Sequence, residues 1–240
     1  MDQSQLTTRL LAALTLNNPP VALTFVDEAP ADVPLTKEVV PSACAFWRHA
    51  ETSTFYAPAE AHFNCPIGSM VMGFEMPEQV QEQLGQMVTM MCQCDYIDPV
   101  EPAHIPTHTG AHTGIVYGPL AEHPTTPSVV LLWLTPMQAM LCNEAGGTAK
   151  WSAETLPRMT GRPGCAALPL ALVNGAPVTS YGCAGMRTFT EIGDDLLLLA
   201  IPGERLADFV QAAEASAAAN KTMEDFYKGH KAAVAQSATG

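Results

Sequence analysis

Short apolar runs alternate with segments of helical periodicity along the whole of this 240-residue chain. The longest runs, SVVLLWL and LLLLAIP, suit buried strands and are far too short to cross a bilayer. Pro and Gly separate most segments, and neither an internal repeat nor a low-complexity linker interrupts the pattern. The alternation therefore predicts an α+β fold, a single compact domain over residues 1–240 with a mixed sheet flanked by helices.

The individual elements follow from periodicity and from breaker residues. Pro169 lies inside one expected helix and should distort it. The chain should end with two helices. Strands are expected at 21–26, 52–57, 115–120, 128–134, 176–182 and 194–202, and helices at 5–16, 42–50, 66–74, 77–91, 136–147, 164–175, 203–219 and 222–235.

The charge balance excludes several classes of partner. The net charge is −13, with only 11 Lys and Arg residues spread along the chain. Nucleic acids and anionic membranes require clustered basic residues, so neither is an expected partner. The polar, acid-containing start does not resemble a signal peptide, which favours a cytoplasmic location. The abundant apolar residues make a homo-oligomer plausible.

Common catalytic fingerprints are missing from the sequence. It contains no Gly-rich phosphate loop, no dinucleotide-binding G-x-G-x-x-G, no G-x-S-x-G and no H-E-x-x-H. The large nucleotide-binding and hydrolase classes therefore receive no support from motifs.

Seven cysteines are the most distinctive chemical feature, and their odd number argues against a disulfide framework. Cys65, Cys165 and Cys183 lie near expected helix starts or glycine turns, and Cys44 lies in a short expected helix. A helix N-terminus favours the thiolate, which both metals and electrophiles require. Four thiolates can hold zinc or an iron–sulfur cluster. The spacing C-x20-C-x99-C-x17-C is not compact, so a shared site requires a fold that gathers distant turns; otherwise these are small buried residues.

Two arginines follow cysteines closely. Arg48 lies four residues after Cys44, and Arg187 lies four residues after Cys183. Each could bind an anionic group or stabilise a reduced cluster. The alternative is an ordinary surface arginine.

Two further groups contain soft or imidazole ligands. His104, His108 and His112 are four residues apart, but Pro106 and Gly110 break the helix that would align them, which favours solvated loop residues. The stretch MVTMMCQCDY would suit Cu(I), although helical periodicity explains part of it as core. Its soft side chains are Met87, Met90, Met91, Cys92 and Cys94.

A metal-free enzyme is a separate possibility. Cys65 or Cys183 would act as a thiolate nucleophile, with His62 or Tyr56 assisting. The competing interpretation of Tyr56, Glu60 and His62 is a strand and turn with incidental polar residues.

Several segments together resemble the bacterial and archaeal family catalogued as domain of unknown function 169. The similar segments are NNPPVALTFV, FYAPAEAHFNCPIGSMVMGF, PSVVLLWLTPMQAMLC, RPGCAALPLALVNGAPVTSYGCAGMR and DDLLLLAIPGERLADFV. The resemblance covers about 5–215 and leaves 216–240 as a helical tail. It implies that the shared cysteines are Cys44, Cys65, Cys165 and Cys183, and that Cys92, Cys94 and Cys142 are peripheral.

These observations lead to a functional hypothesis. The chain is expected to be a cytoplasmic redox or cofactor-binding protein whose four shared cysteines ligate an iron–sulfur cluster or another thiophilic metal. Widely separated cysteines favour a cluster over zinc, whose structural sites use close-spaced ligands. A redox partner protein or a small anionic molecule would then be the partner. The alternatives are the metal-free thiolate enzyme and a non-catalytic module that binds a small molecule near AFW and MVMGF.

Overall fold

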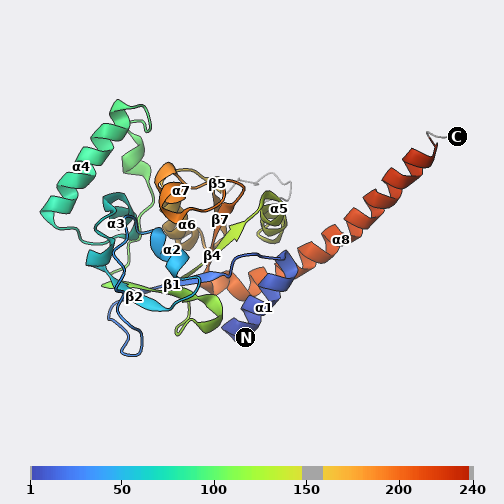
Figure 1. The fold of residues 1–240 in the computed structure, drawn as a ribbon, viewed down its shortest axis with the longest axis horizontal. Coiled ribbons are helices and arrows are strands. Elements are labelled where there is room, and N and C mark those ends of the chain that lie inside the picture. Colours follow the sequence, from blue (N-terminus) through green and yellow to red (C-terminus); the bar gives the residue numbers. More distant parts are fainter. Residues whose placement is uncertain (1, 148–158, 238–240) are drawn as a thin grey trace.

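One seven-stranded sheet with helices on both faces forms the body of the protein (Figure 1). The computed structural model describes residues 2–147 and 159–237. All strand pairs are antiparallel except β5 with β6, so the expected mixed sheet is confirmed. In spatial order the strands are β2 (Phe55–Pro58), β3 (Gly114–Pro119), β1 (Val21–Val26), β4 (Val129–Leu134), β7 (Leu197–Pro202), β6 (Val178–Ser180) and β5 (Met159–Thr160).

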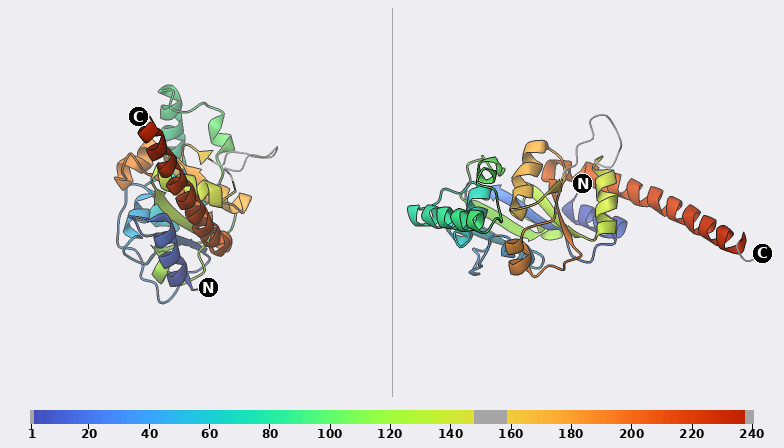
Figure 2. Two further views of the ribbon diagram at one scale, coloured as in Figure 1. Left: turned by 90° about the vertical axis from the view of Figure 1, so that its right-hand side faces the viewer. Right: turned by 90° about the horizontal axis from the view of Figure 1, so that it is seen from above.

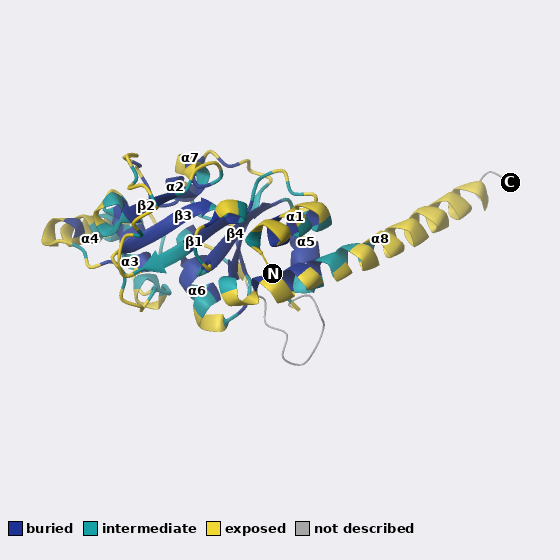
Figure 3. Ribbon diagram, turned by 90° about the horizontal axis from the view of Figure 1, so that it is seen from below, coloured by how far each residue is buried: buried dark blue, intermediate teal, exposed yellow. Residues whose placement is uncertain are grey.

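The central strand β4 shows why the sheet needs helices on both sides. Its residues alternate between two cores, with Leu131 and Trp133 on one face and Leu132 and Leu134 on the other. All six residues of β4 are buried, as expected for a strand covered on both faces (Figure 3).

The helices divide into two groups according to these cores. Figure 2 gives two further views of how the helices are arranged around the sheet. The first core takes side chains from α2 (Ala45–His49), α3 (Pro66–Met72), α6 (Ala167–Asn174) and α7 (Ala184–Thr190). The second takes them from α1 (Gln3–Leu14), α5 (Pro136–Ala145) and α8 (Leu206–Ser237). A further helix, α4 (Glu78–Gln93), lies at the periphery beside α3.

The expected pair of C-terminal helices is wrong, because α8 is one continuous helix. No Gly or Pro separates the two predicted segments, so nothing in the sequence stops the first. Asn220, at the expected break, instead donates hydrogen bonds to the Glu144 carboxylate and to the Ser216 carbonyl. Beyond this point α8 is exposed and projects away from the body (Figure 1).

The expected distortion at Pro169 is also not observed. The helix α6 begins at Ala167, so Pro169 occupies its first turn. The N–H groups of a first turn have no partner within the helix, and a missing N–H there costs nothing. A short 3-10 helix, η4 (Gly164–Ala166), precedes α6 and replaces the earlier start that the sequence indicated.

Within residues 2–147 and 159–237, no helix has both the length and the apolar character that crossing a membrane requires.

Removing the projecting end of α8 should barely affect stability. A chain ending at Asn220 loses only exposed residues of the described helix, so its free energy of unfolding in urea should change by less than about 0.5 kcal/mol. Phe209, which is 4% exposed between α8 and the sheet, is the control, because Phe209→Ala should cost about 3–5 kcal/mol. A clear loss of stability on truncation would show that this segment packs against something in solution.

Candidate functional site

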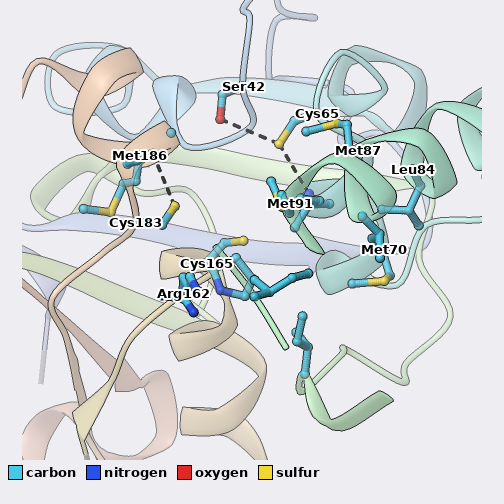
Figure 4. Close-up of a pocket in the computed structure, with 18 of the residues that line it drawn as sticks. Ser42, Cys65, Met70, Leu84, Met87, Met91, Arg162, Cys165, Cys183 and Met186 are labelled. Carbon is cyan, nitrogen blue, oxygen red and sulfur yellow. Dashed lines mark hydrogen bonds between the residues drawn. The ribbon is translucent and has the colours of Figure 1, made fainter. Parts of the chain in front are cut away.

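Cys44, Cys65, Cys165 and Cys183 all line one cavity of about 200 Å³, between the first core and α4 (Figure 4). They come from four separate segments: the start of α2, the start of α3, η4 and the start of α7. The fold thus brings together the distant turns on which a shared site depends.

The sulfur of Cys65 is held by the first turn of α3. Cys65 is the N-cap of that helix, and its Sγ accepts a hydrogen bond from the backbone N–H of Gly68 at 3.3 Å. A Cβ at position 68 would lie 3.0 Å from this sulfur and 3.1 Å from the Ala43 Cβ. Glycine at this position therefore allows the helix to approach the sulfur closely.

Cys183 repeats this arrangement at α7, a helix that the sequence did not predict. Its Sγ accepts the backbone N–H of Met186 at 3.4 Å, and Cys183 is the N-cap. Gly182 has φ +81°, and a Cβ there would lie 2.1 Å from the Met186 Cε. The positive φ favours glycine before the cysteine, and a larger residue would also have to displace the flexible end of Met186.

Ser42 connects the sulfurs of Cys44 and Cys65. Its buried hydroxyl forms a hydrogen bond with Cys44 Sγ at 2.9 Å and donates to Cys65 Sγ at 3.7 Å. Nothing in the sequence pattern indicates that this residue contacts both sulfurs.

The cysteines also affect one another electrostatically. Burial raises the pKa of the Cys44 thiol to about 12, the hydrogen bond from Ser42 opposes this rise, and the neighbouring Cys65 and Cys183 add to it. Burial likewise raises the pKa of Cys165 well above its usual value, with further increases from Cys65, Cys183 and Cys44. Without a bound cation, Cys44 and Cys165 are therefore neutral thiols at neutral pH.

The four sulfurs share a cavity but do not converge on one point. Among the residues described, no three Cys, His, Asp or Glu side chains are grouped so that they could hold a single metal ion. This arrangement differs from a closed tetrahedral zinc site. An iron–sulfur cluster distributes its thiolate ligands over several iron atoms instead.

The two arginines expected at the site are held elsewhere. Arg48 pairs with Glu51, whose carboxylate also accepts the indole N–H of Trp133 at 3.1 Å. Arg187 donates to the carbonyls of Tyr181 and Leu196, at 2.8 and 3.1 Å, and so fixes the loops around Cys183. Neither arginine is among the described residues that line the cavity. The structure therefore does not support the expected contact of Arg48 and Arg187 with a bound group.

Arg162 lines the cavity in their place. Its Nη2 lies 3.4 Å from Glu101 Oε1, and its guanidinium lies 4.6 Å from the centre of the Tyr96 ring. Both of these partners also line the cavity. Arg162 lies three residues before Cys165. Its proximity to a cysteine could have identified it from the sequence, but only arginines that follow a cysteine were considered.

The residues expected to assist a thiolate nucleophile are occupied within the protein. His62 is fully buried, with Nδ1 2.8 Å from the Pro58 carbonyl and Nε2 2.9 Å from the Tyr117 hydroxyl. Burial lowers the pKa of His62 to about 4. The Tyr56 hydroxyl lies 3.1 Å from Thr113 Oγ1.

The loop histidines form an aromatic cluster rather than part of the cysteine wall. His108 stacks on Phe25 with ring centroids 4.0 Å apart, and His112 meets His108 edge-on at 4.9 Å. His104 lies in a short 3-10 helix, η2 (Glu101–His104). The structure places none of these three among the described residues that line the cavity.

The predicted soft-metal stretch is divided by the geometry of α4. Met87 and Met91 line the cavity, whereas Met90 is 52% exposed. Cys92 and Cys94 lie at the end of the helix, outside the set of described residues that line the cavity. The stretch therefore does not form a single cluster.

The wall opposite the cysteines is apolar. It consists of one face of α4, which carries Leu84, Met87, Val88 and Met91, together with Met70 of α3. Helical periodicity placed Met87 and Met91 in the core, whereas Val80 is the only buried residue of α4.

Comparison with known proteins identifies the family of the chain. The model of a family described as Uncharacterised ArCR, domain of unknown function 169, matches residues 9–212. The chain belongs to this family. The match to this domain of unknown function 169 spans all seven cysteines of the chain, including the four that line the cavity. No curated protein and no solved structure matches the chain.

The differing environments of the cysteines predict an order of thiol labelling in metal-free protein. At pH 8, iodoacetamide should modify buried Cys44 at least about tenfold more slowly than the partly exposed Cys65 and Cys183, because burial keeps the Cys44 thiol protonated. Exposed Cys94 provides the fast reference. Mass spectrometry of tryptic peptides over time gives each rate, and equal rates for Cys44 and Cys94 would contradict the structure.

Proposed function

We propose that this protein is a cytoplasmic redox or cofactor-binding protein in which Cys44, Cys65, Cys165 and Cys183 ligate an iron–sulfur cluster. The observation that carries the proposal is that cysteines from four distant segments line one cavity. Chance placement of small buried residues does not account well for this, since the other described cysteines lie elsewhere: Cys142 is in the opposite core, and Cys92 and Cys94 are at the end of α4.

The four cysteine sulfurs and the N–H groups around them favour an iron–sulfur cluster over other thiophilic metal groups. Four thiolates are the usual ligands of [2Fe–2S] and [4Fe–4S] clusters, and backbone N–H groups that donate to sulfur are a common means of tuning their potential. Cys65 and Cys183 each accept such a bond. The wide separation of the four cysteines along the chain makes zinc the less favoured alternative, because structural zinc sites more often use paired, close-spaced ligands.

The raised pKa values of Cys44 and Cys165 would make cluster binding depend on pH. Both thiols must lose a proton to become ligands, and a cationic iron centre supplies the charge that compensates burial of the thiolates. Loading should therefore release protons and become weaker as the pH falls. A reducing cytoplasm would keep the four thiols available.

The alternative of a metal-free thiolate enzyme is less well supported. A nucleophile at Cys65 or Cys183 needs a base within hydrogen-bonding reach. His62 and Tyr56, the expected assistants, already contact Tyr117 and Thr113. The non-catalytic module that binds a small molecule remains compatible with the cavity itself.

Anaerobic purification tests the proposal directly. The protein should be brown, with a broad absorption band near roughly 400 nm and iron and acid-labile sulfide in stoichiometric amounts. Cys183→Ser should lose the colour and most of the iron, while its circular dichroism stays that of the parent protein.

Cys142→Ser is the matched control. Cys142 is a buried cysteine in the opposite core, so this variant should keep the cluster. A colourless parent protein without iron would refute the proposal, as would equal loss of iron from both variants.

A further inference from the structure

The α4 side of the cavity has a surface that the cysteines do not use. In Figure 4, Met87 and Leu84 lie on the side of Cys65 away from Cys183, and Met91 lies below Cys65. These side chains are only partly buried, although they form the apolar face of an amphipathic helix. Such a face gains free energy when it is covered, and here it borders a cavity.

A single cation lies in the wall of this cavity. Arg162 is the only Lys or Arg among the described residues that line it, in a protein of net charge −13. Its one ion-pair partner there is Glu101, at 3.4 Å, and the two side chains are 39% and 41% exposed. An exposed, long ion pair of this kind is weak, and a guanidinium has five N–H donors.

We propose that this cavity binds an amphipathic anion, with its apolar body against the Leu84, Met87 and Met91 face of α4 and its carboxylate on Arg162. Methionine side chains adapt to flexible apolar ligands, and a guanidinium binds a carboxylate through two parallel hydrogen bonds. Tyr96 holds the guanidinium over its ring, and its hydroxyl accepts the backbone N–H of Ala184 at 3.2 Å. This contact fixes Tyr96 beside the start of α7, the helix whose N-cap is Cys183.

The ligand would therefore meet the cysteine wall directly. The inference deepens the proposed function, since it names the class of molecule that contacts the cluster, and it rests on that function only for the reaction that would follow binding. The Glu101 carboxylate competes with the ligand for Arg162. Removal of the Glu101 charge should therefore strengthen anion binding, whereas removal of the Arg162 charge should weaken it.

Calorimetric titration with octanoate and with uncharged octan-1-ol tests the proposal. Both should bind at one saturable site. Arg162→Gln should weaken octanoate binding about tenfold and leave octan-1-ol unchanged, because only octanoate uses the guanidinium. Glu101→Gln should tighten octanoate binding several-fold.

Two variants of α4 separate the cavity wall from the outer surface. Met87→Gln should weaken both ligands several-fold, and Met90→Gln, an exposed change three residues along the same helix, should weaken neither. Absence of saturable octanoate binding, equal effects of Arg162→Gln on both ligands, or equal effects of the two methionine variants would overturn the inference.

The titrations are performed on protein as purified and on Cys183→Ser protein, with iron measured in each. Octanoate binding to iron-free protein would support the inference even if the cluster proposal fails. Stoichiometric iron without octanoate binding would overturn the inference and leave the cluster proposal intact.

Discussion

Packing on one face of the central sheet fixes the position of every cysteine at the site. The elements α2, α3, α6 and α7 all bury apolar side chains in the first core, including Phe46, Met72, Leu168 and Met186. Each of these helices has a site cysteine at its start or just before it. The sulfurs meet because the core places these helix starts side by side, although the cysteines are far apart in the sequence.

Local backbone geometry then directs the sulfurs into the cavity. Cys65 and Cys183 both cap a helix and accept an N–H from its first turn. Gly68 permits the close approach at the first, and Gly182 forms the turn at the second. The same capping arrangement occurs at two helices of seven residues each, and in both it fixes the orientation of the sulfur.

Electrostatics make the empty and loaded forms of such a site different. Neutral thiols at Cys44 and Cys165 are stable in a buried place, and their pKa values are raised for that reason. A bound cationic centre reverses the preference, because thiolates are then compensated by positive charge. The apolar α4 wall would strengthen this coupling, since a low local dielectric increases the interaction between charges.

Much of the fold follows from sequence periodicity. The strand at 21–26 was predicted at its observed bounds, because its apolar run is flanked by clear breaker residues. The two-residue β5 is too short to produce a pattern. The helix α7 was missed because Gly185 in its first turn resembles a continued loop, and the Cys183 cap has no counterpart among the usual capping residues.

The site was predictable only in part. Spacing alone could not show that the four cysteines meet, and the family resemblance identified them. Proximity to a cysteine led to the prediction of Arg48 and Arg187 as site residues. In the structure Arg48 pairs with Glu51, and Arg187 donates to backbone carbonyls that include that of Gly193. Arg162 and the α4 wall depend on tertiary contacts between segments far apart in the chain, such as Arg162 with Glu101 and Ala184 with Tyr96, which periodicity does not encode.

Anomalous diffraction at the iron absorption edge, from crystals grown without oxygen, tests the central claim most directly. The account predicts iron density within the cavity and bonded to the sulfurs of Cys44, Cys65, Cys165 and Cys183. Iron at another place, or a cavity without iron in which these four sulfurs remain thiols, would contradict it.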